Sequence, residues 1–157
     1  MEGDEGGDAR GGLDASEVED GLWVGGHPAP GQVTEDDFDV LVLLARGNQQ
    51  DGLAGVGVDV ARASPALEDE PGDMPEGQAE EAIRAGRWVA RQVKAGRRVL
   101  VTCEEGLNRG PLVAALALMN LDGVDWEDAV GRLRTVRGEH ALNNPAFLSL
   151  LQRYVRG

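Results

Sequence analysis

The chain is poor in cysteine, in basic residues and in long apolar runs, and each scarcity excludes a class of protein. Cys103 is the only cysteine among 157 residues, so no internal disulfide can form and a reducing cytoplasm is the setting we expect. No apolar run approaches the ~18 residues of a membrane-spanning helix, so we expect no membrane partner. The N-terminal residues include no apolar segment typical of a secretory signal.

Basic residues are outnumbered by acidic ones, 15 against 28, which leaves a net charge of −13. Broad nucleic-acid binding needs a basic surface, so we expect no nucleic-acid partner. Residues 1–20 hold eight acids and one arginine, a net charge of −7, and many glycines. We therefore predict a disordered acidic, Gly-rich tail over residues 1–19 and one domain over residues 20–157, acting as a monomer.

The surroundings of Cys103 are the most informative part of the sequence. Residues 99–101 form an apolar, β-branched run typical of a buried strand, and residues 112–121 form a helix-like run. The first N–H groups of a helix lack intrahelical partners, and together with the helix dipole they bind anions. The same field favours the thiolate, which is the nucleophilic form of cysteine. The alternative is that Cys103 is a small buried apolar residue.

Two further residues favour the first interpretation. Arg109 follows five residues after Cys103, and its planar guanidinium can bind two oxygens of one phosphate. Gly106, between them, can adopt backbone angles that other residues avoid, and it brings no side chain near the anion. Residues 103–109 therefore predict a phosphate-binding loop that contains a nucleophile.

The pattern Cys-x-x-Gly-x-x-Arg between a strand and a helix resembles the signature loop of the protein tyrosine phosphatase superfamily, in its compact dual-specificity-like branch. Other segments resemble the same family. They are residues 21–26 for its opening strand, 39–44 for its second strand, and 134–138 with 144–147 for its closing helices. The resemblance thus covers about residues 20–155.

This resemblance implies an α/β fold with a central, mainly parallel sheet of about four to five strands flanked by helices. It also implies hydrolysis of phosphomonoesters, such as phosphotyrosine or phosphoserine and phosphothreonine in proteins, with no metal or other cofactor. Cys103 would be the nucleophile. The phosphate would be held by Arg109 and the backbone of Glu104, Glu105, Gly106, Leu107 and Asn108. We expect the side chains of Glu104 and Glu105 to point away from the phosphate.

Such a reaction needs a general acid to protonate the leaving group. The resemblance implies an aspartate on a loop that precedes the cysteine. Asp69 stands two residues before Pro71, which resembles the Asp-x-Pro form of the family. Asp73 lies nearer the typical sequence separation and remains the alternative, although Asp69 is preferred.

Two positions depart from the family pattern. Thr102 stands where the family has histidine, and Gly110 stands where it has serine or threonine. The resemblance implies that a hydroxyl at this position supports the Cys103 thiolate as it leaves the phosphoenzyme. Because Gly110 has no hydroxyl, we predict slow hydrolysis of that intermediate. The alternative function is therefore a catalytically impaired pseudophosphatase that binds phosphate or acts as a scaffold.

Hydrophobic patterning predicts the remaining elements. Strands are expected at 22–24, 40–44, 56–60 and 98–102, and helices at 76–95, 111–121 and 126–137. Asp125 is the expected N-cap of the third helix, and Asn144 caps a last helix that begins at Pro145. Alternating strands and helices predict a parallel sheet covered on both faces, with ligands at the carboxyl ends of its strands.

Overall fold

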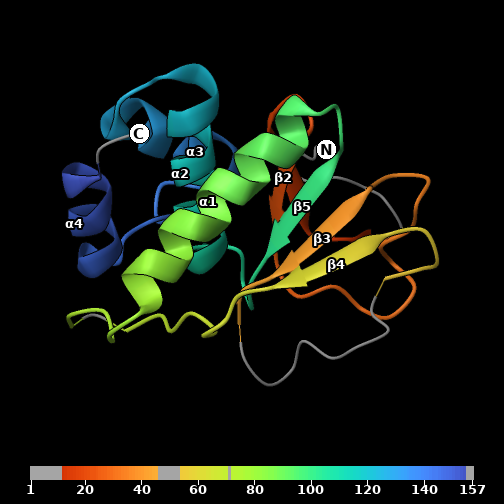
Figure 1. Ribbon diagram of the computed structural model, residues 1–157, viewed down its shortest axis with the longest axis horizontal. Helices are drawn as coiled ribbons and strands as arrows, with labels where there is room; N and C mark the ends of the chain where they lie inside the picture. The colour runs from red at the N-terminus through yellow and green to blue at the C-terminus, as the bar shows by residue number, and fades with distance from the viewer. Residues whose placement is uncertain (1–11, 46–53, 71, 155–157) are drawn as a thin grey trace.

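The computed structural model describes residues 12–45, 54–70 and 72–154 of the chain. Within them a five-stranded sheet has the order β1-β2-β5-β3-β4 (Figure 1). Its strands are β1 (Ala15–Glu19), β2 (Leu22–Gly25), β3 (Val40–Leu43), β4 (Asp59–Arg62) and β5 (Val99–Thr102). Only β1 runs antiparallel to its neighbour, so the prediction of a mainly parallel sheet is confirmed.

The described residues also form four helices. They are α1 (Gln78–Lys94), α2 (Arg109–Asp122), α3 (Trp126–Arg137) and α4 (Pro145–Arg153). Both predicted caps are confirmed: Asp125 accepts a hydrogen bond from the N–H of Asp128, and Asn144 accepts from the first turn of α4. None of the helices in the described ranges has the length and apolarity needed to cross a membrane.

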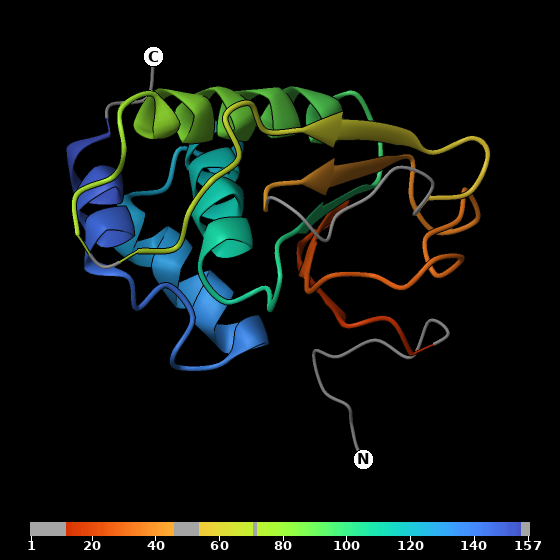
Figure 2. The same cartoon turned by 90° about the horizontal axis from the view of Figure 1, so that it is seen from below.

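The helices gather on one side of the sheet (Figure 2). Alternate strand residues, such as Val24 and Val101, face the helices and share a core with them. Residues of opposite orientation, such as Trp23, form a second core with Val33 and Phe38 from the segment between β2 and β3. Trp23 and Phe38 meet edge to face with ring centroids 5.6 Å apart. Both faces are covered as predicted, but in the described residues a loop, not a helix, covers the second.

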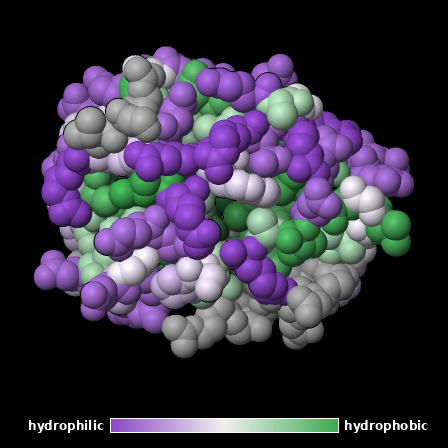
Figure 3. All heavy atoms as spheres, in the orientation of Figure 1, coloured by the Kyte–Doolittle hydropathy of each residue, from purple (hydrophilic) through white to green (hydrophobic). Residues whose placement is uncertain are grey.

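Helix α2 packs against both the sheet and α1 and is buried from Gly110 to Met119. Gly86 of α1 permits the close approach of the two helices, because a Cβ there would lie 2.5 Å from the Cβ of Leu116. The outer surface in the view of Figure 3 is mostly hydrophilic, with smaller hydrophobic patches between. This central packing holds the start of α2, and the loop before it, in a rigid frame.

The predicted tail ends earlier than expected. Residues 1–11 lie outside the described residues, but Ala15–Glu19 form β1, so the prediction of disorder is wrong for this segment. Asp20-Gly21 makes the turn of a hairpin with β2, and Gly21 has a φ of 87°. Asp-Gly is a strong signal of a hairpin turn. The strand was not predicted because the residues around this turn are acidic and rich in glycine.

Strand β4 is also displaced from its predicted position. The strand was expected at 56–60 and lies at Asp59–Arg62, while Gly57, with a φ of 94°, belongs to a turn. Val56 is 94% exposed. Because β4 is an edge strand, its register is set by pairing with β3 rather than by burial of alternating apolar residues.

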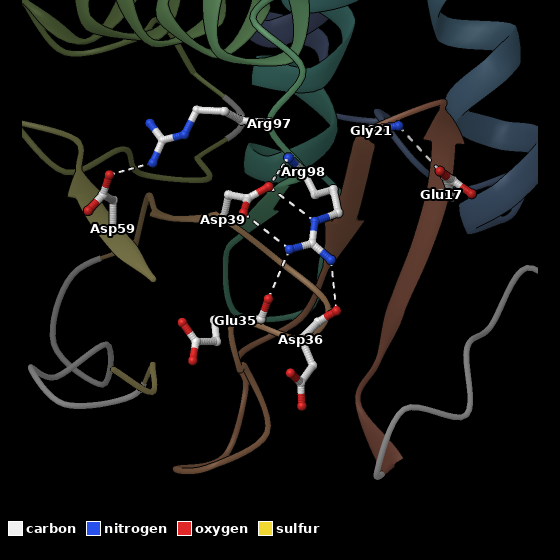
Figure 4. Close-up of polar contacts among 8 residues, drawn as sticks. All are labelled: Glu17, Gly21, Glu35, Asp36, Asp39, Asp59, Arg97 and Arg98. Atoms are coloured by element: carbon white, nitrogen blue, oxygen red, sulfur yellow. Dashed lines mark hydrogen bonds and ion pairs between the residues drawn. The ribbon is translucent and has the colours of Figure 1, made fainter. Parts of the chain in front are cut away.

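Arg98 joins the amino ends of β5 and β3, at the end of the sheet opposite Cys103 (Figure 4). It donates from its backbone N–H and its Nε to Asp39 Oδ2, at 2.8 and 3.1 Å. Its other nitrogens donate to the carbonyls of Asp36 at 2.7 Å and Glu35 at 2.9 Å. The hydrogen bonds that Arg98 donates to the Asp39 carboxylate lower the pKa of that group to about 2.

Candidate active site

The Cys103 loop, residues 103–109, connects β5 to α2 at the carboxyl end of the sheet. Cys103 is 2% exposed, and the N–H of Gly110 donates to its Sγ at 3.3 Å. The hydroxyl of Thr102 donates to the carbonyl of Val42 at 2.8 Å and ties the end of β5 to β3. The thiol is therefore placed at the N-terminus of a buried helix, where an N–H donor and the helix dipole stabilise negative charge.

The carbonyl groups of the Cys103 loop are turned toward the protein behind it. The donors are the N–H of His27 for Glu104, Arg137 for Glu105 and Gly106, and the N–H of Leu142 for Leu107, at 2.7–3.1 Å. In a trans peptide the N–H of the next residue points to the opposite side from the carbonyl. The N–H groups of residues 105–108 consequently point away from these donors, in the arrangement of a backbone anion-binding nest.

Arg137 of α3 is the main support behind this loop, and its side chain is only 7% exposed. Its Nη1 also forms an ion pair with Asp14 at 2.9 Å. Gly106 lies against it with a φ of 71°, and a Cβ there would lie 2.5 Å from Arg137 Nη2 and 2.7 Å from the carbonyl carbon of Gly25. Gly106 was predicted from the sequence, but Arg137 was not, because it lies 31 residues beyond Gly106 in the chain.

Arg109 lies in the pocket with its side chain 14% exposed. Its Nη1 donates to the carbonyl of Leu67 at 3.3 Å, and its Nη2 donates to Glu104 Oε1 at 3.1 Å. Within the described residues, its buried Nε has no acceptor. The expectation that Glu104 points away from the phosphate site is wrong, because a largely buried guanidinium needs acceptors and Glu104 is the adjacent carboxylate.

A pocket of about 700 Å³ opens above the Cys103 loop. It brings the predicted catalytic residues Cys103, Arg109 and Asp69 to one place, while Gly106 supports the loop and Asp73 is not among the lining residues. The wall consists of residues from two loops and one position before α4: Leu67, Glu68, Asp69, Glu70, Cys103, Glu104, Glu105, Leu107, Asn108, Arg109 and Asn143.

Two asparagine side chains hold the Asp69 carboxylate. Asn108 Nδ2 donates to Asp69 Oδ2 at 3.0 Å, and Asn144 Nδ2 donates to Oδ1 at 2.7 Å. Asn144 is 5% exposed and also donates to the carbonyl of Glu70 at 2.8 Å. From the sequence, Asn144 is predicted only as a helix cap. The pattern Asn-Pro predicts a cap, but it carries no information about the partner of the amide nitrogen.

The Asp69 loop, residues 63–70 and 72–76, has no regular structure and depends on contacts with other elements. Gln78, which is 3% exposed, accepts from the N–H of Glu68 at 3.0 Å and donates to the carbonyl of Ala66 at 2.9 Å. The N–H of Leu67 donates to the carbonyl of Leu44, just after β3, at 2.8 Å. These bonds bring Asp69 over the pocket.

A resident metal has no evident place in the described part of the chain, because no three His, Cys, Asp or Glu side chains there are grouped to hold one. The polar groups of the pocket are instead the carboxylates, amides and single guanidinium described above.

Several known proteins are similar to this chain. No family model matches the chain. The chain is 31% identical over 135 residues to mouse dual specificity protein phosphatase 12, and this match covers 82% of the chain but only 38% of that protein. Human DUSP28 is 26% identical, with a TM-score of 0.74 over 89% of this chain and 91% of that one. Tk-PTP in its active form is 21% identical, with a TM-score of 0.69 over 90% and 98%.

These similarities and the geometry of the fold confirm the resemblance noted in the sequence. The chain has the dual-specificity phosphatase-like fold of the protein tyrosine phosphatase superfamily. It spans less than half the length of the curated mouse relative.

Proposed function

We propose that the protein is a cysteine-dependent phosphatase that hydrolyses phosphomonoesters, with phosphorylated protein side chains as substrates. One observation carries the proposal: Cys103, Arg109 and Asp69 line a single pocket although Asp69 is 34 residues distant from Cys103 in sequence. The phosphatase names of the similar proteins support the same reaction class.

In the first step the Cys103 thiolate attacks phosphorus, an S–P bond forms and the bond from phosphorus to the leaving oxygen breaks. Negative charge on the transferred phosphoryl oxygens is stabilised by Arg109 and by the N–H groups of residues 105–108. The carboxyl group of Asp69 donates its proton to the leaving oxygen.

In the second step the Asp69 carboxylate accepts a proton from water as that water attacks phosphorus. The S–P bond breaks, inorganic phosphate is released and the Cys103 thiolate is restored. The N–H of Gly110, 3.3 Å from Sγ, is the donor that supports this thiolate as it leaves.

The test is a comparison of the wild-type protein with Cys103→Ser and Asp69→Asn on an aryl phosphate. We expect Cys103→Ser to abolish release of the aryl product, a loss of at least ~1,000-fold. Asp69→Asn should lower turnover by about 100-fold or more, with a greater loss for alkyl leaving groups, which need the proton more. Release that is unaffected by Cys103→Ser would refute the proposal.

The second candidate function is a phosphate-binding pseudophosphatase, and the observation that favours it is Gly110. At this position only a backbone N–H reaches Sγ, where the family pattern has a hydroxyl in addition. Rapid-mixing kinetics separate the two functions. A burst of one equivalent of product followed by almost no turnover indicates a trapped phosphoenzyme, whereas sustained turnover excludes the pseudophosphatase.

A further inference from the structure

The rim of the pocket is strongly acidic. Five acidic residues are among those that line it, Glu68, Asp69, Glu70, Glu104 and Glu105, against a single arginine. They belong to the Asp69 loop and the Cys103 loop. A site for a dianionic phosphate would be expected to have the opposite balance of charge.

The groups proposed to bind phosphate are buried, whereas several of the acidic residues are exposed. Cys103 is 2% exposed and the Arg109 side chain 14% exposed, so the groups proposed to bind phosphate lie at the floor. Glu70 and Glu105 are exposed, and the Glu104 side chain is 52% exposed. The phosphoryl group would therefore meet donors at the floor, while the residues on either side of it in a substrate would meet carboxylates.

We infer that the preferred substrates are phosphorylated peptide segments with arginine or lysine next to the phosphorylated residue. This inference rests on the proposed function, which it deepens by naming a substrate class. Basic flanking residues offset the repulsion between the phosphate and the rim, and acidic ones add to it. The net charge of −13 of the whole chain also attracts basic peptides as they approach the protein.

The expected size of the preference follows from exposed ion pairs. Such pairs are individually weak, and two or three of them together change affinity by about tenfold. Their attraction is screened by salt, because the Debye length falls from about 10 Å at 0.1 M to about 3 Å at 1 M.

The experiment uses two phosphotyrosine peptides that differ only at the two flanking positions, arginine in one and glutamate in the other. We expect kcat/KM to favour the arginine peptide by about tenfold at low ionic strength and the ratio to approach one near 1 M salt. The double variant Glu68→Gln/Glu70→Gln and the variant Glu105→Gln should reduce the ratio. The matched control is Glu127→Gln, an exposed glutamate on α3 outside the pocket, which should leave it unchanged.

An aryl phosphate without flanking residues is assayed in parallel, so loss of catalysis is distinguished from loss of preference. Both peptides are also titrated with Cys103→Ser, which measures preference by binding where turnover is absent. Equal affinity for the two peptides, or a preference for glutamate, overturns the inference even if the aryl phosphate is hydrolysed. A preference for arginine that the rim variants do not reduce overturns it as well.

Discussion

The Cys103 loop and the Asp69 loop supply the two halves of the same pocket, but they are held in place in different ways. The Cys103 loop lies between a strand and a helix, has a positive φ at Gly106, and its carbonyls accept hydrogen bonds from His27, Arg137 and Leu142 behind it. The Asp69 loop has no regular structure and is held by side chains of Gln78, Asn108 and Asn144. The nucleophile is thus placed by the adjacent strand and helix together with contacts behind the loop, whereas the acid lies on a loop without such flanking elements and depends on long-range contacts.

The largest effect is expected where the backbone geometry of the Cys103 loop is broken. In Gly106→Ala the new Cβ would overlap Arg137 and Gly25 and would strain a φ of 71°. Because displacement of catalytic groups by about 1 Å can cost ~100-fold, we expect turnover to fall by at least that factor. Steady-state assays measure the turnover of this variant, and circular dichroism measures whether it is folded.

Gly96→Ala is the matched control for this change. Gly96 has a similar φ of 88°, but a Cβ there would meet nothing within 4 Å. We expect it to cost about 1 kcal/mol of stability with turnover retained. Similar losses of activity in both variants would contradict the steric explanation for Gly106.

An intermediate effect is expected where the support of Asp69 is removed. In Asn144→Asp the new carboxylate can still accept hydrogen bonds from the first turn of α4, but it cannot donate to Asp69. Since a general acid contributes 10²–10⁴-fold when well placed, we expect turnover of an alkyl phosphate to fall by about tenfold. An activated aryl phosphate, whose leaving group needs no proton, should be affected far less.

The control for helix capping is Asp125→Ala on α3. It removes only the cap contact with Asp128, so it should lower stability by about 0.5–2 kcal/mol and leave both activities unchanged. An equal loss on both substrates in Asn144→Asp would mean that Asn144 supports the fold and not the acid.

A smaller effect on turnover is expected when Gly110, which lies behind the Cys103 thiol, is replaced. A Cβ at this position would lie 3.6 Å from Cys103 Sγ and 3.2 Å from Val24 Cγ1. A serine hydroxyl can therefore reach Sγ, and we expect Gly110→Ser to speed hydrolysis of the phosphoenzyme by severalfold, since a typical hydrogen bond contributes a net ~0.5–1.5 kcal/mol. Gly110→Ala adds the same Cβ without a hydroxyl, so it should not speed hydrolysis of the phosphoenzyme. Equal rates in the two variants would refute the role given to the hydroxyl.

The smallest effect is expected at the opposite end of the sheet, away from both loops. The pKa of Asp39, lowered to about 2 by Arg98, lies below its value of about 3.9 in an unfolded chain. Its contribution to stability is therefore present above pH ~4 and is lost as the pH falls toward about 2. The side chain is 35% exposed, so we expect Asp39→Asn to cost less than about 1 kcal/mol.

Thermal unfolding of both proteins between pH 7 and pH 2 measures this contribution. The difference in melting temperature should shrink over the range from pH 4 to pH 2, with turnover at neutral pH the same in both. A difference independent of pH would show that the ion pair is not its source.

Most of the fold and half of the site could be predicted from sequence. The strand before Cys103, the helix after it and the caps at Asp125 and Asn144 depend on residues close together in the chain, and all agree with the structure. β1 was missed because its composition is acidic, and β4 was displaced because its register depends on β3. The pairing of Glu104 with Arg109 depends on how a loop folds back, which spacing does not encode.

The amino-acid sequence by itself determined the Cys103 loop, because a strand, a glycine turn and a helix N-terminus follow one another within a few residues. Only the tertiary structure decided the rest of the site. Asp69 reaches the pocket through amides that lie 39 and 75 residues further along the chain, and Arg137 supports the loop from 31 residues beyond Gly106. Such contacts are set by the packing of whole elements around the sheet, and no local pattern specifies them.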